Sequence, residues 1–152
     1  MNETLSWRRP TPFILEWHID NSVIDHYGHV NNVAYISKIE ELAWAHSNAL
    51  GLTIQQYQEI DRGMAIQRHE IDYLLPCHEG QTIACATWIV ECDRRLSLTR
   101  QFEFICLERK KPVFAARTQF VCISLTTGAP KRMPDLFKSI YGKAAMEQEA
   151  SI

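Results

Sequence analysis

An eleven-residue stretch, DHYGHVNNVAY from Asp25 to Tyr35, holds a high density of side chains that can do acid–base chemistry. It contains a carboxylate, two imidazoles and two adjacent amides, with a glycine before the second imidazole. The four residues from Asp25 to Gly28 suit a type I turn, which favours Asp at its first position and Gly at its last. Asn31 or Asn32 suits the N-cap of a helix that follows. On these residues alone, the stretch fits both a plain helix cap and a site of catalysis.

The catalytic interpretation uses the same geometry as the cap. The N-terminus of a helix presents unpaired backbone N–H groups and a partial positive charge. An acyl carbonyl placed there has its developing oxyanion stabilised as its carbon is attacked. A carboxylate held one turn upstream, where Asp25 stands, either attacks that carbonyl carbon or activates a water molecule against it.

The elements around this stretch must hold it in place. PFILEWHID, from Pro12 to Asp20, predicts a first strand. From Val33, apolar residues recur at three- and four-residue steps and predict a helix of about 17 residues up to Leu50. Gly51 follows at the position that a helix C-terminus favours. The apolar stripe consists of Tyr35, Ile36, Ile39, Leu42, Ala43, His46, Ala49 and Leu50.

The rest of the chain is mostly strand-like. TIQQYQEIDRG is consistent with a short helix closed by Gly63, and the tail DLFKSIYGKAAMEQEA with a final helix or a frayed end. Between them, short turns join four runs that predict an antiparallel meander. These runs are MAIQRHEIDYLL, QTIACATWIVEC, LSLTRQFEFICLE and VFAARTQFVCISL. We therefore expect one α+β domain over residues 1–152, with one long helix and about five antiparallel strands.

An oligomer is expected from the distribution of apolar residues. Both alternating sets of QTIACATWIVEC are largely apolar, so neither face of that strand suits water. A single substantial helix covers only one face of a sheet, and the other face must be hidden elsewhere. A homodimer is the simplest arrangement that does this.

Composition narrows the function classes. The net charge of −2 argues against a general nucleic-acid surface. The N-terminal stretch MNETLSWRRPTPF has no apolar run after its arginines, so we expect no secretory signal. No apolar run approaches the roughly 18 residues of a membrane span. The five cysteines are odd in number and never spaced as Cys-x-x-Cys, which favours buried free thiols in a reducing cytoplasm. No His-x-His, His-Glu-x-x-His or Gly-x-Ser-x-Gly pattern occurs, so we expect no metal, no cofactor and no serine nucleophile.

The pattern D-H-Y-G-H-V-N-N-V-A-Y-x-x-x-x-E-E, which begins at Asp25, resembles the signature of the hotdog-fold acyl-CoA thioesterases. This group contains 4-hydroxybenzoyl-CoA thioesterase and the long-chain acyl-CoA thioesterases of bacteria. EIDYLLPCHEGQTI is similar to the second strand and turn of the family, and the resemblance extends from Phe13 to Pro134.

The resemblance implies a long helix wrapped by an antiparallel sheet that pairs edge to edge into a homodimer or homotetramer. It places the catalytic acid on Asp25 and the oxyanion donor on the backbone N–H of Asn32. It places Tyr35 beside the site. His29 is a candidate second catalytic group, although we favour an orienting or packing role for it next to the substrate. VECDRRLS resembles the basic turn by which some members hold the nucleotide of coenzyme A, which makes Arg94 and Arg95 the expected phosphate ligands.

The expected function is hydrolysis of an acyl-CoA thioester to a free acid and coenzyme A, and several alternatives stay open. Some hotdog thioesterases use a glutamate of the helix, which makes Glu40 the second candidate acid. A hotdog hydratase or dehydratase, a non-catalytic acyl-CoA-binding module and a thioesterase for acyl-carrier protein are the other functions considered. The aromatic side chains fit either an aromatic or an aliphatic acyl group.

Overall fold

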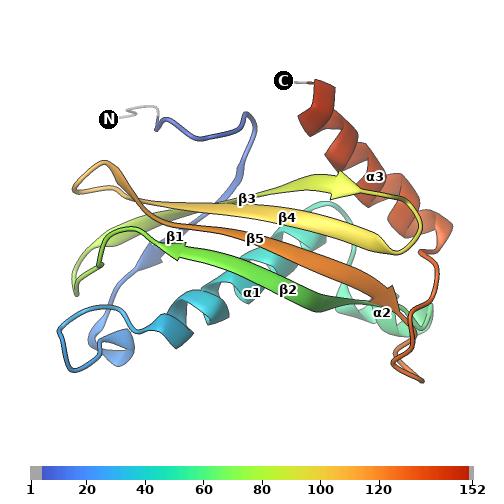
Figure 1. Cartoon of the computed structure of the whole chain (residues 1–152), viewed down its shortest axis with the longest axis horizontal. Helices are drawn as coiled ribbons and strands as arrows, with labels where there is room; N and C mark the ends of the chain where they lie inside the picture. Colours follow the sequence, from blue (N-terminus) through green and yellow to red (C-terminus); the bar gives the residue numbers. More distant parts are fainter. Residues whose placement is uncertain (1–4, 151–152) are drawn as a thin grey trace.

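The structure, a computed structural model, describes residues 5–150, and its framework is an antiparallel sheet packed on one long helix (Figure 1). Its strands are β1 (Phe13–His18), β2 (Gly63–Tyr73), β3 (Thr82–Cys92), β4 (Ser97–Cys106) and β5 (Lys111–Ile123). They form one five-stranded sheet in the order β1-β3-β4-β5-β2, and each neighbouring pair is antiparallel. The helices are α1 (Asn32–Ala49), α2 (Ile54–Glu59) and α3 (Asp135–Ala150), with a 3-10 turn over Asn21–Val23. This is the α+β hotdog arrangement, one long helix with five antiparallel strands, that we expect from the sequence. The predicted four-strand meander is wrong for its first strand, because β2 pairs with β5 at the edge of the sheet and only β3, β4 and β5 follow one another.

Helix α1 begins and ends within one residue of its predicted limits, and its end residues explain why. The side chain of Asn31 is the N-cap and accepts a hydrogen bond from the N–H of Ala34 at 2.9 Å. At the other end, Gly51 adopts a φ of +99°, and the N–H of Leu52 donates to the carbonyl of Ser47 at 2.8 Å. A residue with a side chain is strained at this φ, so the glycine is what stops the helix here.

The core lies between α1 and the sheet. Tyr35, Ile39 and Leu42 of α1 are buried against Phe102 and Phe104 of β4. Each such side chain stabilises the fold by about 1.5–3 kcal/mol when it leaves water. This packing fixes the start of α1, and with it the DHYGHVNN loop, relative to the sheet.

The prediction that Gly63 closes the short helix is wrong. Helix α2 ends before Ile60, and the left-handed residue that follows is Asp61, with a φ of +52°. Asp61 tolerates this conformation because Ser124 and Thr126 hold its carboxylate at 2.7 and 2.8 Å. Gly63 instead begins β2, where a Cβ atom would lie 2.7 Å from Leu125 Cδ2. A side chain at position 63 would have to displace the end of the Leu125 side chain.

The chain itself covers the outer face of β3, which corrects our reason for expecting a dimer. Trp7 packs edge-to-face on Trp88, with ring centroids 6.1 Å apart, and Trp88 Nε1 donates to the carbonyl of Pro10 at 2.9 Å. The tail is a helix rather than a frayed end, and α3 lies alongside β3 (Figure 1). Gln148 of α3 donates to the same Pro10 carbonyl at 3.0 Å. A second copy is therefore not needed to hide β3.

β2 forms one edge of the sheet, and β1 forms the other. No strand within residues 5–150 pairs with the outer edge of β2, and Ile66, Tyr73 and Leu74 are 50%, 47% and 44% exposed. A long, unprotected edge strand is a surface on which another chain can pair. The homo-oligomer stays a prediction on this ground.

Two further sequence expectations bear on the chemistry of the chain. All five cysteines are free thiols, with Cys92 half-buried and the others buried, as predicted. Among the helices in residues 5–150, none combines the length and apolar character that a membrane crossing requires.

Candidate active site

The loop before α1 orients the Asp25 carboxylate through backbone hydrogen bonds. The predicted turn is present, because the N–H of Gly28 donates to the Asp25 carbonyl at 3.1 Å and Gly28 has a φ of +77°. Oδ1 of Asp25 accepts from the N–H of Tyr27 at 2.9 Å and from that of His29 at 3.1 Å. The N–H of Asp25 in turn donates to the carbonyl of His29 at 2.8 Å. One carboxylate oxygen is thus committed to holding the loop.

The second oxygen of Asp25 is available for chemistry. No hydrogen-bond or ion-pair partner for Oδ2 is found within residues 5–150. The residue is half-buried, so a ligand can reach the carboxylate while the loop limits its motion. A group held at one oxygen and open at the other is suited to act as a nucleophile or general base.

Two anchors fix this loop on the rest of the fold. The N–H of Val30 donates to the carbonyl of Cys77 at 2.9 Å, which ties the loop to the segment before β3. Asn31 donates to the Val23 carbonyl from its backbone at 2.8 Å and from its side chain at 2.9 Å. Asn31 therefore caps α1 and closes the loop at once.

The first turn of α1 leaves N–H groups open next to the loop. The cap side chain takes only the N–H of Ala34, and those of Asn32 and Val33 have no backbone partner within residues 5–150. Asn32 and Val33 are both exposed. With the partial positive charge of the helix end, these N–H groups suit a carbonyl oxygen that gains negative charge.

His29 and Tyr35, the other candidates in the motif, lie differently. His29 is half-buried, and its ring meets that of His78 edge-to-face at 5.1 Å. Tyr35 is only 3% exposed and stacks on Phe114 at 4.9 Å. Burial and a hydrogen bond with the Cys77 thiol raise the pKa of its hydroxyl, so the ring stays neutral. This burial favours a packing role beneath the loop over direct contact with substrate.

Arg94 and Arg95 lie far from Asp25 within one chain. The loop is anchored just before β3 begins, whereas the two arginines follow the end of β3 (Figure 1). Eleven residues of strand separate these ends by roughly 35 Å. Arg95 is exposed, while Arg94 donates to the carbonyl of Gly142 in α3 at 3.2 Å. Lys138 and Lys143 of α3, which the sequence analysis did not single out, lie with Arg94 in a shallow cleft.

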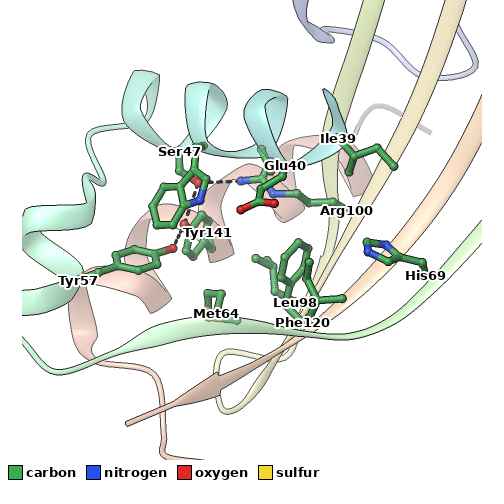
Figure 2. A pocket seen from close by; sticks show the side chains of 13 residues that line it. Ile39, Glu40, Ser47, Tyr57, Met64, His69, Leu98, Arg100, Phe120 and Tyr141 are labelled. Atoms are coloured by element: carbon green, nitrogen blue, oxygen red, sulfur yellow. Dashed lines mark hydrogen bonds between the residues drawn. The ribbon is translucent and has the colours of Figure 1, made fainter. Parts of the chain in front are cut away.

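A separate pocket of about 280 Å³ lies beneath the second half of α1, between that helix and the sheet (Figure 2). Glu40, the alternative acid, is exposed and lines this pocket, whereas Asp25 does not. The apolar part of the lining includes Ile39, Trp44, Met64, Leu98 and Phe120, and the polar part includes Ser47, Tyr57, His69, Arg100 and Tyr141.

Four polar residues of the pocket lining form one connected hydrogen-bond network, namely Ser47, Tyr57, Arg100 and Tyr141. Arg100, only 2% exposed, donates to His46 Nδ1 and to Ser47 Oγ, each at 2.8 Å. Ser47 Oγ is 2.9 Å from the Tyr141 hydroxyl, which also hydrogen-bonds the Tyr57 hydroxyl. Figure 2 shows Ser47, Tyr57, Arg100 and Tyr141 gathered under α1. The network joins α1, α2, α3 and β4.

A second polar pair, His69 and Thr118, lies beside this network on the sheet. Thr118 of β5 stands directly opposite Arg100 of β4, and His69 of β2 stands opposite Thr118. His69 Nδ1 and Thr118 Oγ1 are 2.8 Å apart. Residues directly opposite one another in an antiparallel pair share a face. A polar row therefore crosses an otherwise apolar sheet face.

Burial sets the charges of the network. Burial and the neighbouring Arg100 charge lower the pKa of His46 to about 3, so its ring is neutral and carries its proton on Nε2. Burial also lowers the pKa of His69, and burial with the Tyr141 hydroxyl raises the pKa of Tyr57. Burial lowers the pKa of Arg100 too, but a guanidinium keeps its charge in proteins. At neutral pH the buried part of the pocket holds one positive charge.

This pocket was not predicted from the sequence, although one signal for it was present. In LSLTRQFEF, the alternating set Leu98, Arg100, Phe102 and Phe104 faces the helix, and one charged residue interrupts it. His46 was counted only as part of the apolar stripe of α1. Ser47, Tyr57 and Tyr141 carried no signal, because contacts distant in sequence bring them together.

Comparison with known proteins gives a family match. The profile of the Thioesterase-like superfamily matches residues 20–140, which include the DHYGHVNN loop, α1 and all strands except β1. No protein in a collection of curated sequences matches this chain.

Several solved structures share the fold at low sequence identity. A hypothetical protein of Staphylococcus aureus in complex with CoA has a TM-score of 0.83 at 14% identity, covering 97% of this chain and 90% of that chain. A DHNA-CoA thioesterase of the same organism has a TM-score of 0.81 at 18% identity, with 93% and 96% covered. A 1,4-dihydroxy-2-naphthoyl-CoA thioesterase of Synechocystis has a TM-score of 0.76 at 18% identity, with 91% and 98% covered.

Proposed function

The chain belongs to the thioesterase-like superfamily, and from this premise we propose that it is an acyl-CoA thioesterase that releases a carboxylic acid and coenzyme A. The observation that carries the proposal is the position of Asp25. Its Oδ1 is held by the N–H groups of Tyr27 and His29, and its Oδ2 has no partner within residues 5–150. The carboxylate precedes the open N-terminus of α1, where a thioester carbonyl fits. Solved CoA thioesterases with the same fold support the substrate class.

In the proposed reaction, the thioester oxygen accepts a hydrogen bond from the backbone N–H of Asn32. Asp25 then acts by one of two routes. As a nucleophile it bonds to the carbonyl carbon, the C–S bond breaks, coenzyme A leaves as a thiolate, and water hydrolyses the mixed anhydride. As a general base it takes a proton from water while the hydroxide bonds to the carbon and the thiolate leaves. Both routes need the ionised carboxylate and the oxyanion donor.

Glu40 remains the alternative acid because it lines the pocket beneath α1. It follows Asn32 by eight residues, or about 12 Å along the helix axis. A thioester carbonyl that lies at the Asn32 N–H is therefore next to the loop that carries Asp25, whereas Glu40 is about two helical turns away. We therefore assign the essential acid to Asp25 and treat Glu40 as the matched comparison.

The phosphates of coenzyme A are assigned to Arg94 and Arg95, and this assignment requires an oligomer. The roughly 35 Å along β3 between these arginines and the loop exceeds the reach of an extended pantetheine arm. The arginines of one copy must then serve the Asp25 of another. The open β2 edge offers a surface for such a homodimer or homotetramer.

The test is the release of free thiol from a panel of acyl-CoA thioesters by the unmutated protein, by Asp25→Asn and by Glu40→Gln. We expect hydrolysis of at least one member of the panel and its loss in Asp25→Asn alone. Loss in Glu40→Gln alone identifies the other carboxylate. If the unmutated protein hydrolyses no thioester but binds acyl-CoA, the chain is a binding module.

A further inference from the structure

The buried guanidinium of Arg100 has hydrogen-bond partners but no counter-anion from the fold. The ion pairs formed within residues 5–150 place no carboxylate within 4.0 Å of it. Its partners, His46 and Ser47, are both neutral. Burying a charge is unfavourable unless an opposite charge accompanies it.

The groups that face Arg100 cannot supply a negative charge. The raised pKa of Tyr57 keeps its hydroxyl protonated at neutral pH. The Tyr141 hydroxyl already bonds Ser47 and Tyr57. Glu40 lines the same pocket, but its side chain is exposed and its carboxylate forms no ion pair with Arg100 within 4.0 Å. The Arg100 guanidinium is therefore a buried positive charge in the pocket without a paired anion among residues 5–150.

The remainder of the pocket is suited to hydrocarbon. Met64, Leu98 and Phe120 line the sheet side of the pocket, and Ile39 lines the part nearest the start of α1 (Figure 2). Trp44 of α1 adds to the apolar lining. An apolar wall that ends at a buried cation matches a ligand with an apolar body and an anionic end. A ligand with an uncharged end group would leave the Arg100 guanidinium without a counter-anion. A carboxylate end group supplies the negative charge and can accept two parallel N–H hydrogen bonds from a guanidinium.

We propose that this pocket binds the acyl group of substrates that carry a carboxylate at the end distal to the thioester, and that Arg100 pairs with that carboxylate. The identification of the ligand as an acyl group rests on the proposed thioesterase function, whereas recognition of a carboxylate does not. Ser47, which contacts Arg100, follows Asn32 by fifteen residues, or about 22 Å along α1. A substrate that reaches both points of one chain is long and extended. The substrate class is thus long ω-carboxyacyl thioesters.

A binding experiment tests the carboxylate without any thioester chemistry. Calorimetric titration compares decanoate with 1-decanol, and dodecanoate with 1-dodecanol, below their aggregation limits at pH 7.5. Each pair has the same chain length and differs in its end group. We expect the carboxylate to bind at least about tenfold more tightly, the range of a charge-assisted hydrogen bond. Equal affinities within both pairs overturn the proposal.

Two substitutions assign the preference to Arg100. Arg100→Lys keeps the charge and is expected to keep most of the preference, whereas Arg100→Met is expected to reduce the ratio to about one. Arg100 also ties β4 to α1, so Arg100→Met can fail to fold; the unmutated protein and Arg100→Lys then still decide the question. A preference that persists unchanged in a folded Arg100→Met overturns the assignment.

A kinetic experiment separates this inference from the proposed function. It compares kcat/KM for ω-carboxyacyl-CoA and unsubstituted acyl-CoA over matched chain lengths from about ten to about twenty carbons, so that the longest chains span the roughly 22 Å along α1. We expect a preference of about tenfold or more for the carboxylated substrate among the longer chains. Hydrolysis of both series without any preference overturns the inference and leaves the thioesterase intact. Hydrolysis of neither series, with decanoate still preferred over decanol, overturns the thioesterase proposal and retains carboxylate recognition by Arg100.

Discussion

The loop before α1 and the pocket beneath its second half both gather polar groups, but in opposite environments. In the loop, Asp25 and Asn32 lie at the surface, and backbone groups a few residues away orient them. In the pocket, Arg100, Ser47 and Tyr141 are buried, and each is held by side chains from a different part of the chain. The first arrangement is local and open to water, whereas the second is long-range and dry.

Because of this difference in environment, substitutions in the two regions are expected to change the free energy of unfolding by different amounts. A carboxylate that stays in contact with water is not strongly desolvated, so its replacement changes chemistry more than stability. A buried network is held by hydrogen bonds of about 0.5–1.5 kcal/mol each, and removal of one member leaves its partners unsatisfied. We therefore expect substitutions in the loop to affect turnover and those in the pocket to affect stability and ligand preference.

The largest expected effect is that of Asp25→Asn on turnover. The amide retains the size and the oxygen that accepts from Tyr27 and His29, so the loop keeps its shape. It removes the negative charge and the basicity, and we expect kcat to fall about a hundredfold or more. Steady-state thiol release measures this, and thermal unfolding is expected to show little change in Tm.

The control for Asp25→Asn is Glu40→Gln, which makes the same chemical change at a residue that lines the pocket. It is expected to retain most of the turnover. Near-normal turnover in Asp25→Asn together with inactive Glu40→Gln would move the chemistry from the loop to the pocket.

The next effect concerns the pH dependence of stability, and it belongs to the pocket. The pKa of His46 is about 3 in the folded protein against an ordinary value of 6.5. Below pH 6.5 the unfolded chain takes up a proton that the folded protein does not, so the free energy of unfolding falls as the pH drops from about 6.5 toward 3. By pH 5 the loss reaches about 2 kcal/mol relative to pH 7.

His46→Gln isolates this contribution, because glutamine offers an acceptor to Arg100 and does not titrate in this range. Chemical denaturation at pH 7 and pH 5 measures the free energy of unfolding of both proteins. The decrease between the two pH values is expected to be about 2 kcal/mol larger in the unmutated protein. Equal decreases would show that His46 is protonated in the folded state and that the pocket is wetter than its burial indicates.

The contrast between the regions also explains what the sequence could predict. The turn at Asp25, the cap at Asn31 and the stop at Gly51 depend on a few adjacent residues, and the structure confirms each. The prediction that Gly63 closes the short helix failed because Gly63 begins β2, where it lies close to Leu125, a residue distant in sequence. The cover on Trp88 was missed for the same reason, since it comes from the N-terminal segment and α3.

The loop and the pocket differ in the same way in how far each could be predicted from the sequence. The loop could be predicted because its candidate catalytic residues and its turn-forming residues lie in one short stretch of sequence. Arg100 is one charged residue in an apolar alternation, and this pattern indicates a buried charge without naming its partners. His46 reaches Arg100 from a helix 54 residues earlier in the chain. No pattern in a single sequence contains that contact.

A smaller effect is expected for Asn31→Ala, which tests whether the loop is truly local. The substitution removes the cap on the Ala34 N–H and the side-chain bond to the Val23 carbonyl. We expect a loss of about 1 kcal/mol in the free energy of unfolding, the usual effect of losing an N-cap. Asn31→Ser, which keeps a capping oxygen, is expected to recover most of it. A loss above about 3 kcal/mol would mean that the loop supports the core as the pocket network does.

The smallest effect is that of removing the two charges after β3. Arg94→Ala with Arg95→Ala is expected to raise KM for acyl-CoA severalfold at low salt with little change in kcat, because groups that bind the nucleotide act on ground and transition states alike. Lys131→Ala with Arg132→Ala removes two exposed charges elsewhere and serves as the control. Arg94 also donates to the Gly142 carbonyl, so Arg95→Ala alone gives the cleaner kinetic result.

The assembly decides how this last result is interpreted. The loop and these arginines lie at opposite ends of β3, so an increase in KM means that the arginines of one copy contact the substrate held by the Asp25 of another. Such a protein must be at least a homodimer at the concentrations of the assay, which light scattering measures. A rise in KM in a protein that is monomeric and active would contradict the distance along the sheet. An unchanged KM in both double variants would make Arg94 and Arg95 ordinary surface charges, and the phosphates would then have to bind nearer to the loop.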